Sequence, residues 1–154
     1  MDPSLEEIDF LARSAHRVGV MEELTTGSRE RRDLRNATDA SSPTMSRILT
    51  DLVARRWIVR DGPRYELTSL GEFVAERFLD LREAMDIERK LRDVWQWLPR
   101  EMEGFSVDLF TEAMVSYPGP GYPYEPVERL THLIENTTRM RGFDSIVFKS
   151  INNE

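Results

Sequence analysis

The chain has 154 residues, of which 40% are hydrophobic and 32% are charged, and its formal net charge is −7. This length fits one medium domain or two small ones. The sequence has no cysteine, which excludes disulfides, zinc ribbons and thiol nucleophiles, and its two isolated histidines, His16 and His132, do not form a metal-binding pattern.

No apolar run is long enough to cross a bilayer. The first ten residues, MDPSLEEIDF, carry acids where a secretory signal carries basic residues. We therefore expect a cytoplasmic protein with no membrane partner. No nucleophile, base and orienting acid occur in a catalytic pattern, so we expect neither enzymatic activity nor a cofactor.

The charge is unevenly distributed along the chain. Residues 1–65 hold 11 arginines and 11 acids, whereas residues 66–154 hold 10 basic and 17 acidic residues. Residues 29–64 contain nine arginines and five acids, a local positive excess that a DNA-binding face requires. Only Lys90 and Lys149 are lysines. This usage fits either a salt-loving archaeon or simply a GC-rich genome.

The first third of the chain is predicted to be helical. Apolar residues recur at three- and four-residue spacing from Leu5 to Leu24, which indicates one amphipathic helix or a bent pair of helices. A short helix is predicted over 31–38, with Leu34 and Ala37 facing inward. Asp39 follows where the chain must reverse, and Asp tolerates the left-handed conformation better than most residues.

A third helix is predicted at about 42–55. Ser41 or Ser42 can cap it through a hydroxyl, and Pro43 fits its first turn. Its apolar stripe consists of Met45, Ile48, Leu49, Leu52 and Val53. A hairpin follows, with strands at 57–59 and 64–68 and a turn at 61–63.

A long helix is predicted from Leu70 to Leu98, ending before Pro99. Its near-heptad apolar pattern requires a partner, although Glu88 interrupts the pattern. In the tail, 107–116 is either a short helix or a strand, 127–140 a helix and 145–151 a strand. The predicted class is mainly α (α+β): a winged helix-turn-helix domain at 1–68, a linker or dimerisation helix at 69–99 and a short, incomplete α/β segment at 100–154.

The helix at 42–55 carries a recognisable motif. Ser41, Thr44, Met45, Ser46, Arg47 and Leu49 resemble the helix-turn-helix pattern of bacterial and archaeal regulators. Small hydroxyl side chains at the start of such a helix can approach phosphates and base edges, and an arginine one turn later can reach a guanine. The candidate DNA contacts on this helix are Ser42, Thr44, Ser46, Arg47 and Thr50.

The hairpin and the LTSLG that follows it resemble the wing and exit helix of winged helix-turn-helix proteins. Arg60 and Arg64 flank the wing tip, where they can contact phosphates or the minor groove. Arg31 and Arg32 begin the second helix near the expected DNA backbone. The alternative is that these arginines solvate the surface and pair with nearby acids such as Asp33.

The chain as a whole resembles haloarchaeal winged-helix transcriptional regulators of the methanogenesis-regulator type. The stretches that carry the resemblance are EIDFLARSAHRVGVMEEL, PTMSRILTDLVARRWI and YPYEPVERLTHLIENTTRMRG. The resemblance implies a C-terminal sensor domain, of which this chain has only the opening, since it stops at Glu154.

These features predict a homodimeric regulator that binds double-stranded DNA sequence-specifically, with the helix at 42–55 in the major groove and the hairpin at 58–67 on the backbone or minor groove. The alternative is a winged-helix module that binds another regulator through its acidic C-terminal half. Binding of an unidentified small-molecule effector by the tail is compatible with either function.

Overall fold

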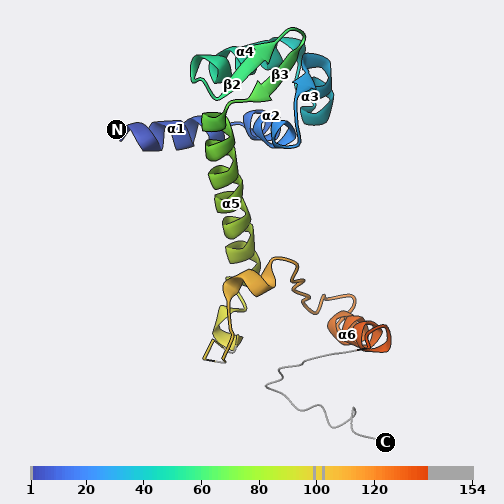
Figure 1. Ribbon diagram of the computed structural model, residues 1–154. Helices are drawn as coiled ribbons and strands as arrows, with labels where there is room; N and C mark the ends of the chain where they lie inside the picture. The colour runs from blue at the N-terminus through green and yellow to red at the C-terminus, as the bar shows by residue number, and fades with distance from the viewer. Residues whose placement is uncertain (1, 99, 102, 139–154) are drawn as a thin grey trace, which may run out of the picture. The chain divides into compact units, whose positions relative to one another are not determined.

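The computed structural model describes residues 2–98, 100–101 and 103–138 (Figure 1). The described part is mainly helical and contains a small, three-stranded antiparallel sheet, which confirms the α+β class and gives a winged-helix-like arrangement. The chain divides into two compact units, Met1–Arg82 and Glu83–Glu154. The division falls within the helix that follows the hairpin.

Two helices form the N-terminal segment, so the bent pair is the correct alternative. Helix α1 (Pro3–Ala12) is followed by α2 (Ala15–Thr25). Ser14 between them has an extended backbone, and its Oγ accepts a hydrogen bond of 3.3 Å from the backbone N–H of Arg17. This capping interaction begins a new helix and thereby prevents α1 from continuing.

Helices α3 (Arg31–Thr38) and α4 (Ser42–Ala54) form at the predicted positions. Asp39 between them adopts the left-handed conformation, with φ 53° and ψ 28°, as predicted. Ser41 is the residue that caps α4, and Pro43 lies in the first turn. The tight turn places the start of α4 beside α3.

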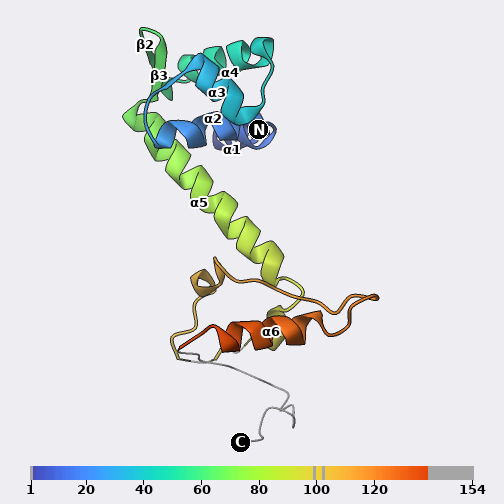
Figure 2. The ribbon, with the colours of Figure 1, turned by 90° about the vertical axis from the view of Figure 1, so that its right-hand side faces the viewer.

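The sheet has the strand order β1-β3-β2. Strands β2 (Ile58–Asp61) and β3 (Arg64–Leu67) form the predicted hairpin, in which Arg60 is opposite Tyr65. The third strand, β1 (Arg29–Glu30), was not predicted, because two residues are too few to produce an alternating pattern. In Figure 2 the hairpin stands beside α4 at one end of this unit.

One hydrophobic core holds the helices and the sheet of the first unit together. Its most deeply buried side chains come from α2, α3, α4 and β2, and they are Val20, Leu34, Met45, Leu52 and Ile58. The predicted inward position of Ala37 is wrong, and Val53, which belongs to the predicted apolar stripe, lies outside the core. Both are exposed, because each lies at the edge of its helix's apolar stripe rather than at its centre.

The long helix is shorter than predicted. Helix α5 (Ser69–Leu91) ends before Leu98, and a 3-10 helix follows at Trp95–Trp97. After Arg92, which bonds four residues back to Glu88, the backbone bonds switch to three-residue spacing, as in Val94 N–H to Leu91 O. Asp, Val and Trp at 93–95 are weaker helix formers than the residues before them, which favours this tighter turn.

In the second unit, residues Val107–Phe110 form a 3-10 helix, so the helical alternative is correct for part of 107–116 and no strand forms there. Helix α6 spans Glu125–Glu135 rather than 127–140, since Pro126 occupies its first turn. Asn136 ends it by donating its side-chain amide to His132 O at 2.8 Å. The strand predicted at 145–151 lies outside the described residues.

Candidate nucleic-acid interface

Hydroxyl side chains organise the first turn of α4. The Oγ of Ser41 accepts the backbone N–H of Thr44 at 3.3 Å and lies 2.8 Å from the Thr44 hydroxyl. Thr44, a predicted DNA contact, therefore shares its hydroxyl with the helix cap. The hydroxyls of Ser46 and Thr50 donate to carbonyl oxygens one turn earlier, at 3.2 and 2.9 Å. These three hydroxyls retain acceptor capacity toward solvent.

Arg31 connects α3 to the start of α4. Its Nη2 donates to the Ser42 carbonyl at 2.9 Å, to the Ser42 hydroxyl at 3.0 Å and to the Ser46 hydroxyl at 2.5 Å. The guanidinium group thus lies over the first turn of α4, where backbone N–H groups already favour an anion. Arg31, Ser42 and Ser46 form one continuous polar surface.

A cavity of about 340 Å³ lies between α4 and the hairpin. It brings together four of the nine predicted DNA-binding residues, namely Arg31, Ser46, Thr50 and Arg60. Leu49, Val53 and Tyr65 complete its wall. The cavity therefore combines two positive charges and two hydroxyls with an apolar surface.

The two arginines of the wing are held differently. The Nε of Arg60 donates to the Gly62 carbonyl at 2.8 Å, and its guanidinium lies 5.9 Å from the Tyr65 ring. Arg64 reaches away from the wing tip to Ser28, where its Nε donates to the hydroxyl at 2.9 Å and its Nη2 to the carbonyl at 2.6 Å. Arg64 thus fastens the wing to the segment that precedes β1.

The remaining predicted contacts, Arg32 and Arg47, are more than three-quarters exposed. Arg32 lies 3.8 Å from Asp33, so the pairing that the alternative interpretation proposed is present at this position. Among the described residues, no ion pair joins Arg60 or Arg64 to Asp61. Arg47 lies next to Asp51, one turn further along α4.

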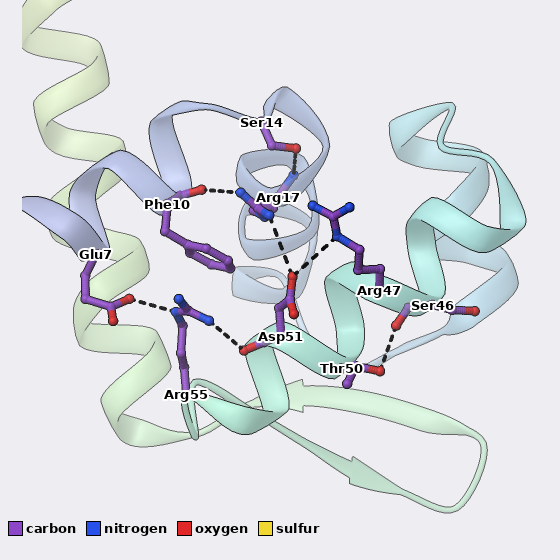
Figure 3. A network of polar contacts seen from close by, with 9 residues as sticks. All are labelled: Glu7, Phe10, Ser14, Arg17, Ser46, Arg47, Thr50, Asp51 and Arg55. Carbon is purple, nitrogen blue, oxygen red and sulfur yellow. Dashed lines mark hydrogen bonds and ion pairs between the residues drawn. The ribbon is translucent and has the colours of Figure 1, made fainter.

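A network of polar contacts joins residues at the end of α4 and on its exposed side to residues of α1 and α2 (Figure 3). Asp51 lies between Arg47 and Arg17, and Arg17 donates to the Phe10 carbonyl at 2.7 Å. Arg55 donates to Glu7 at 2.7 Å. The network joins α1 and α2 to α4 by contacts between residues that are far apart in the sequence.

Sequence reasoning assigned no DNA contact to three further residues of α3, α4 and the hairpin. Tyr65 and Val53 line the cavity, and Arg35 is an exposed arginine of α3 with no recorded partner in the described part of the chain. Two signals were available. Tyr65 is the cross-strand partner of Arg60 in the hairpin, and Arg35 lies one helical turn after Arg31.

The described residues, 2–98, 100–101 and 103–138, contain neither a metal site nor a membrane-spanning helix. No group of three or more His, Asp or Glu side chains there is placed to hold a metal ion. No helix in the same ranges is long and apolar enough to span a membrane. The arginine- and hydroxyl-lined face of α3, α4 and the hairpin is a candidate site for an anionic partner.

Comparison with known proteins adds a family. The family model described as the HVO_A0261 N-terminal domain matches residues 5–90. Neither the curated proteins nor the solved structures contain a match to the chain. The matched residues cover more than half of the chain and include every residue of the candidate interface. The chain therefore belongs to the HVO_A0261 N-terminal domain family, a haloarchaeal family.

Proposed function

We propose that the chain is a winged helix-turn-helix transcriptional regulator, of the methanogenesis-regulator type, that binds double-stranded DNA sequence-specifically. Helix α4 would enter the major groove, and the β2–β3 wing would contact the backbone or minor groove. The observation that carries the proposal is the cavity in which Arg31 and Arg60 flank the hydroxyls of Ser46 and Thr50.

The chemistry of this cavity suits a DNA backbone and the adjoining base edges. Arginine and hydroxyl groups are the usual donors to phosphate oxygens, and such contacts set the register of a protein on the duplex. The apolar side chains of Leu49 and Val53 lie beside these donors and suit the methyl group of a thymine.

Arg47 and Arg64 have different roles in this proposal. Arg47 is exposed on α4 and reads a base, whereas Arg64 lies on the wing and neutralises a phosphate. The same proposal includes a homodimer, whose two α4 helices would reach half-sites about one turn of DNA, or a multiple, apart. Such a regulator acts in the cytoplasm, where the DNA of an archaeal cell lies.

The test is a gel-shift titration of the purified protein against fragments of its own upstream region and against random DNA, across a salt series. Arg47→Ala should reduce sequence preference by about 1 to 3 kcal/mol at one base pair, while Arg64→Ala should weaken binding to all sequences and flatten the salt slope. Arg89→Ala removes one exposed positive charge from the second unit and serves as the matched control.

Tight, salt-dependent binding to one fragment, selectively lost in Arg47→Ala, would support the proposal and locate the operator. Equal loss on every sequence for Arg47→Ala would contradict its role as a base reader. No preference over random DNA at any salt concentration at which the protein is folded would reject sequence-specific binding.

A second function, a protein-interaction module that binds another regulator through the C-terminal half, is favoured by a separate observation. Several large apolar side chains of the second unit are exposed, among them Trp97, Leu109, Met114, Tyr124 and Leu133. Large apolar side chains on the surface become buried when a partner protein covers them, which would stabilise such a complex. This unit also contains a cavity of about 340 Å³ beside Trp95, which would suit a small apolar effector.

A further inference from the structure

We propose that Asp51 is a positioning residue that sets the sequence selectivity of Arg47. The inference rests on the proposed DNA-binding function and adds to it a residue that orients the reading side chain. Asp51 lies on α4 one turn after Arg47, and the carboxylate oxygen Oδ2 is shared by two guanidinium groups, those of Arg47 and Arg17.

Arg17 provides the fixed side of this arrangement. Its side chain is only 13% exposed, and its Nη2 lies 3.6 Å from Asp51 Oδ2. Its Nη1 donates to the Phe10 carbonyl at 2.7 Å, and its guanidinium stacks 3.9 Å from the centre of the Phe10 ring. The Nε of Arg17 is buried and has no hydrogen-bond partner. The Asp51 carboxylate is therefore the acid that compensates a largely buried charge.

The backbone of Asp51 is held as well. Arg55 donates from Nη1 to the Asp51 carbonyl at 3.3 Å and from Nε to Glu7 at 2.7 Å (Figure 3). The guanidinium of Arg55 also lies 3.5 Å from the centre of the Phe10 ring. Asp51 therefore has a restricted position on α4, because Arg17 contacts its carboxylate and Arg55 donates to its backbone carbonyl.

Arg47 lies on the solvent-exposed side of Asp51. Its side chain is 78% exposed, and its Nε lies 4.0 Å from Asp51 Oδ2. Neither of its terminal nitrogens donates to an acceptor within the described residues. Asp51 thus contacts Arg47 through Nε only. The two Nη atoms of Arg47 remain available to donate hydrogen bonds to a guanine edge. A contact that restricts the Arg47 side chain before binding reduces the entropy that is lost when the side chain contacts a base.

Asp51 also has an electrostatic consequence. Its side chain is 32% exposed and adds a negative charge to the face that would meet DNA. This charge opposes phosphates on any sequence, whereas the orientation of Arg47 favours only a correct base. The repulsion weakens binding to operator and random DNA alike and cancels in their ratio, so Asp51 should raise this ratio through the orientation of Arg47.

The test measures this ratio, at one salt concentration, for the wild-type chain, Asp51→Asn, Arg47→Ala and the double variant. Asp51→Asn should tighten binding to random DNA and lower the ratio about three- to tenfold. In the Arg47→Ala background the orientational part of this loss should disappear. Asp61→Asn removes the same charge from the wing and is the control for electrostatics alone. Asp51→Glu, which keeps a carboxylate at this spacing, should restore most of the ratio.

The outcomes separate the two proposals. A wild-type ratio near one rejects sequence-specific binding itself. If the wild-type ratio is high, three results would overturn the positioning role alone. Asp51→Asn could leave the ratio unchanged, or lower it only as much as Asp61→Asn does. It could also lower the ratio equally in the wild-type and Arg47→Ala backgrounds.

A measurement on the wild-type chain covers the case in which Asp51→Asn fails to fold. Nitrogen-15 relaxation of the arginine Nε groups should give Arg47 a higher order parameter than Arg35, an exposed arginine without a recorded partner in the described residues. Equal order parameters for the two side chains would overturn the proposal.

Discussion

The carbonyl oxygen of Trp57 occupies the space in which any other residue at Gly71 would place its Cβ. An added Cβ would lie only 1.8 Å from this oxygen. The same carbonyl accepts the backbone N–H of Thr68 at 3.0 Å, and the Thr68 hydroxyl accepts the N–H of Gly71 at 3.0 Å. Helix α5 therefore begins in direct contact with the residue that precedes β2.

Gly71→Ala should destabilise the first unit by about 3 kcal/mol or more, because the backbone on one side of the contact must move. Urea denaturation would measure the change in the free energy of unfolding. Glu72→Ala, an exposed substitution on the same turn of α5, is the control and should cost well under 1 kcal/mol. Similar values for the two variants would contradict the close approach of Gly71 to Trp57.

Arg31→Ala should weaken DNA binding roughly tenfold, since it removes a charge from the cavity and releases the hydroxyls of Ser42 and Ser46. Arg35→Ala removes an equal charge one turn away on α3 and is the control. Arg35 makes no hydrogen bond or ion pair within the described residues, so its loss should weaken DNA binding less. Fluorescence anisotropy with one labelled duplex would compare them. A larger loss in Arg35→Ala would show that α3 contacts DNA through a different part of its surface.

Acid should weaken the attachment of α5 to α2. The hydrogen bonds that Arg82 donates to Glu22, at 2.7 and 2.9 Å, lower the pKa of Glu22 below its ordinary value of 4.5, and desolvation opposes this shift. The resulting stability is fully present above pH 4.5 and is lost as the pH falls through the lowered pKa. Both side chains are more than 40% exposed, so solvent screening reduces the contribution to a few tenths of a kcal/mol.

Urea midpoints of the wild type and Glu22→Gln, measured between pH 6 and pH 3, would test this contribution. The difference in stability between the two proteins should shrink toward acid pH. A difference that stays constant over this range would mean that ionisation of Glu22 does not stabilise the fold.

Local signals explain why much of the first unit was predictable. The cap at Ser41, the proline at Pro43 and the left-handed Asp39 each act within a few residues. Pro43 and Asp39 occur as predicted, and Ser41 is one of the two predicted caps. The period of the apolar residues located the helices because burial is their main stabilising term. Pro99 predicts too late an end for α5, because the helix ends at Leu91.

Contacts between distant residues could not be read from these patterns. The pairing of β1 with β3, the approach of Gly71 to Trp57 and the contact of Arg17 with Asp51 each join segments that only the fold brings together. The candidate site also combines features that a local pattern predicts with features that depend on the fold. Its hydroxyls and arginines were predicted from a local motif, but the cavity they share with Tyr65 depends on where the hairpin packs.

The two guanidinium groups around Phe10 indicate how the first unit responds to concentrated salt. Figure 3 shows the Phe10 ring between the side chains of Arg17 and Arg55. The two guanidinium groups lie 3.9 and 3.5 Å from the centre of the ring. At 1 M salt the Debye length is about 3 Å, so exposed ion pairs are largely screened, whereas partly buried contacts are screened much less. At high salt concentration the contacts of Phe10 with Arg17 and Arg55 should therefore still join α1, α2 and α4 after exposed ion pairs are screened.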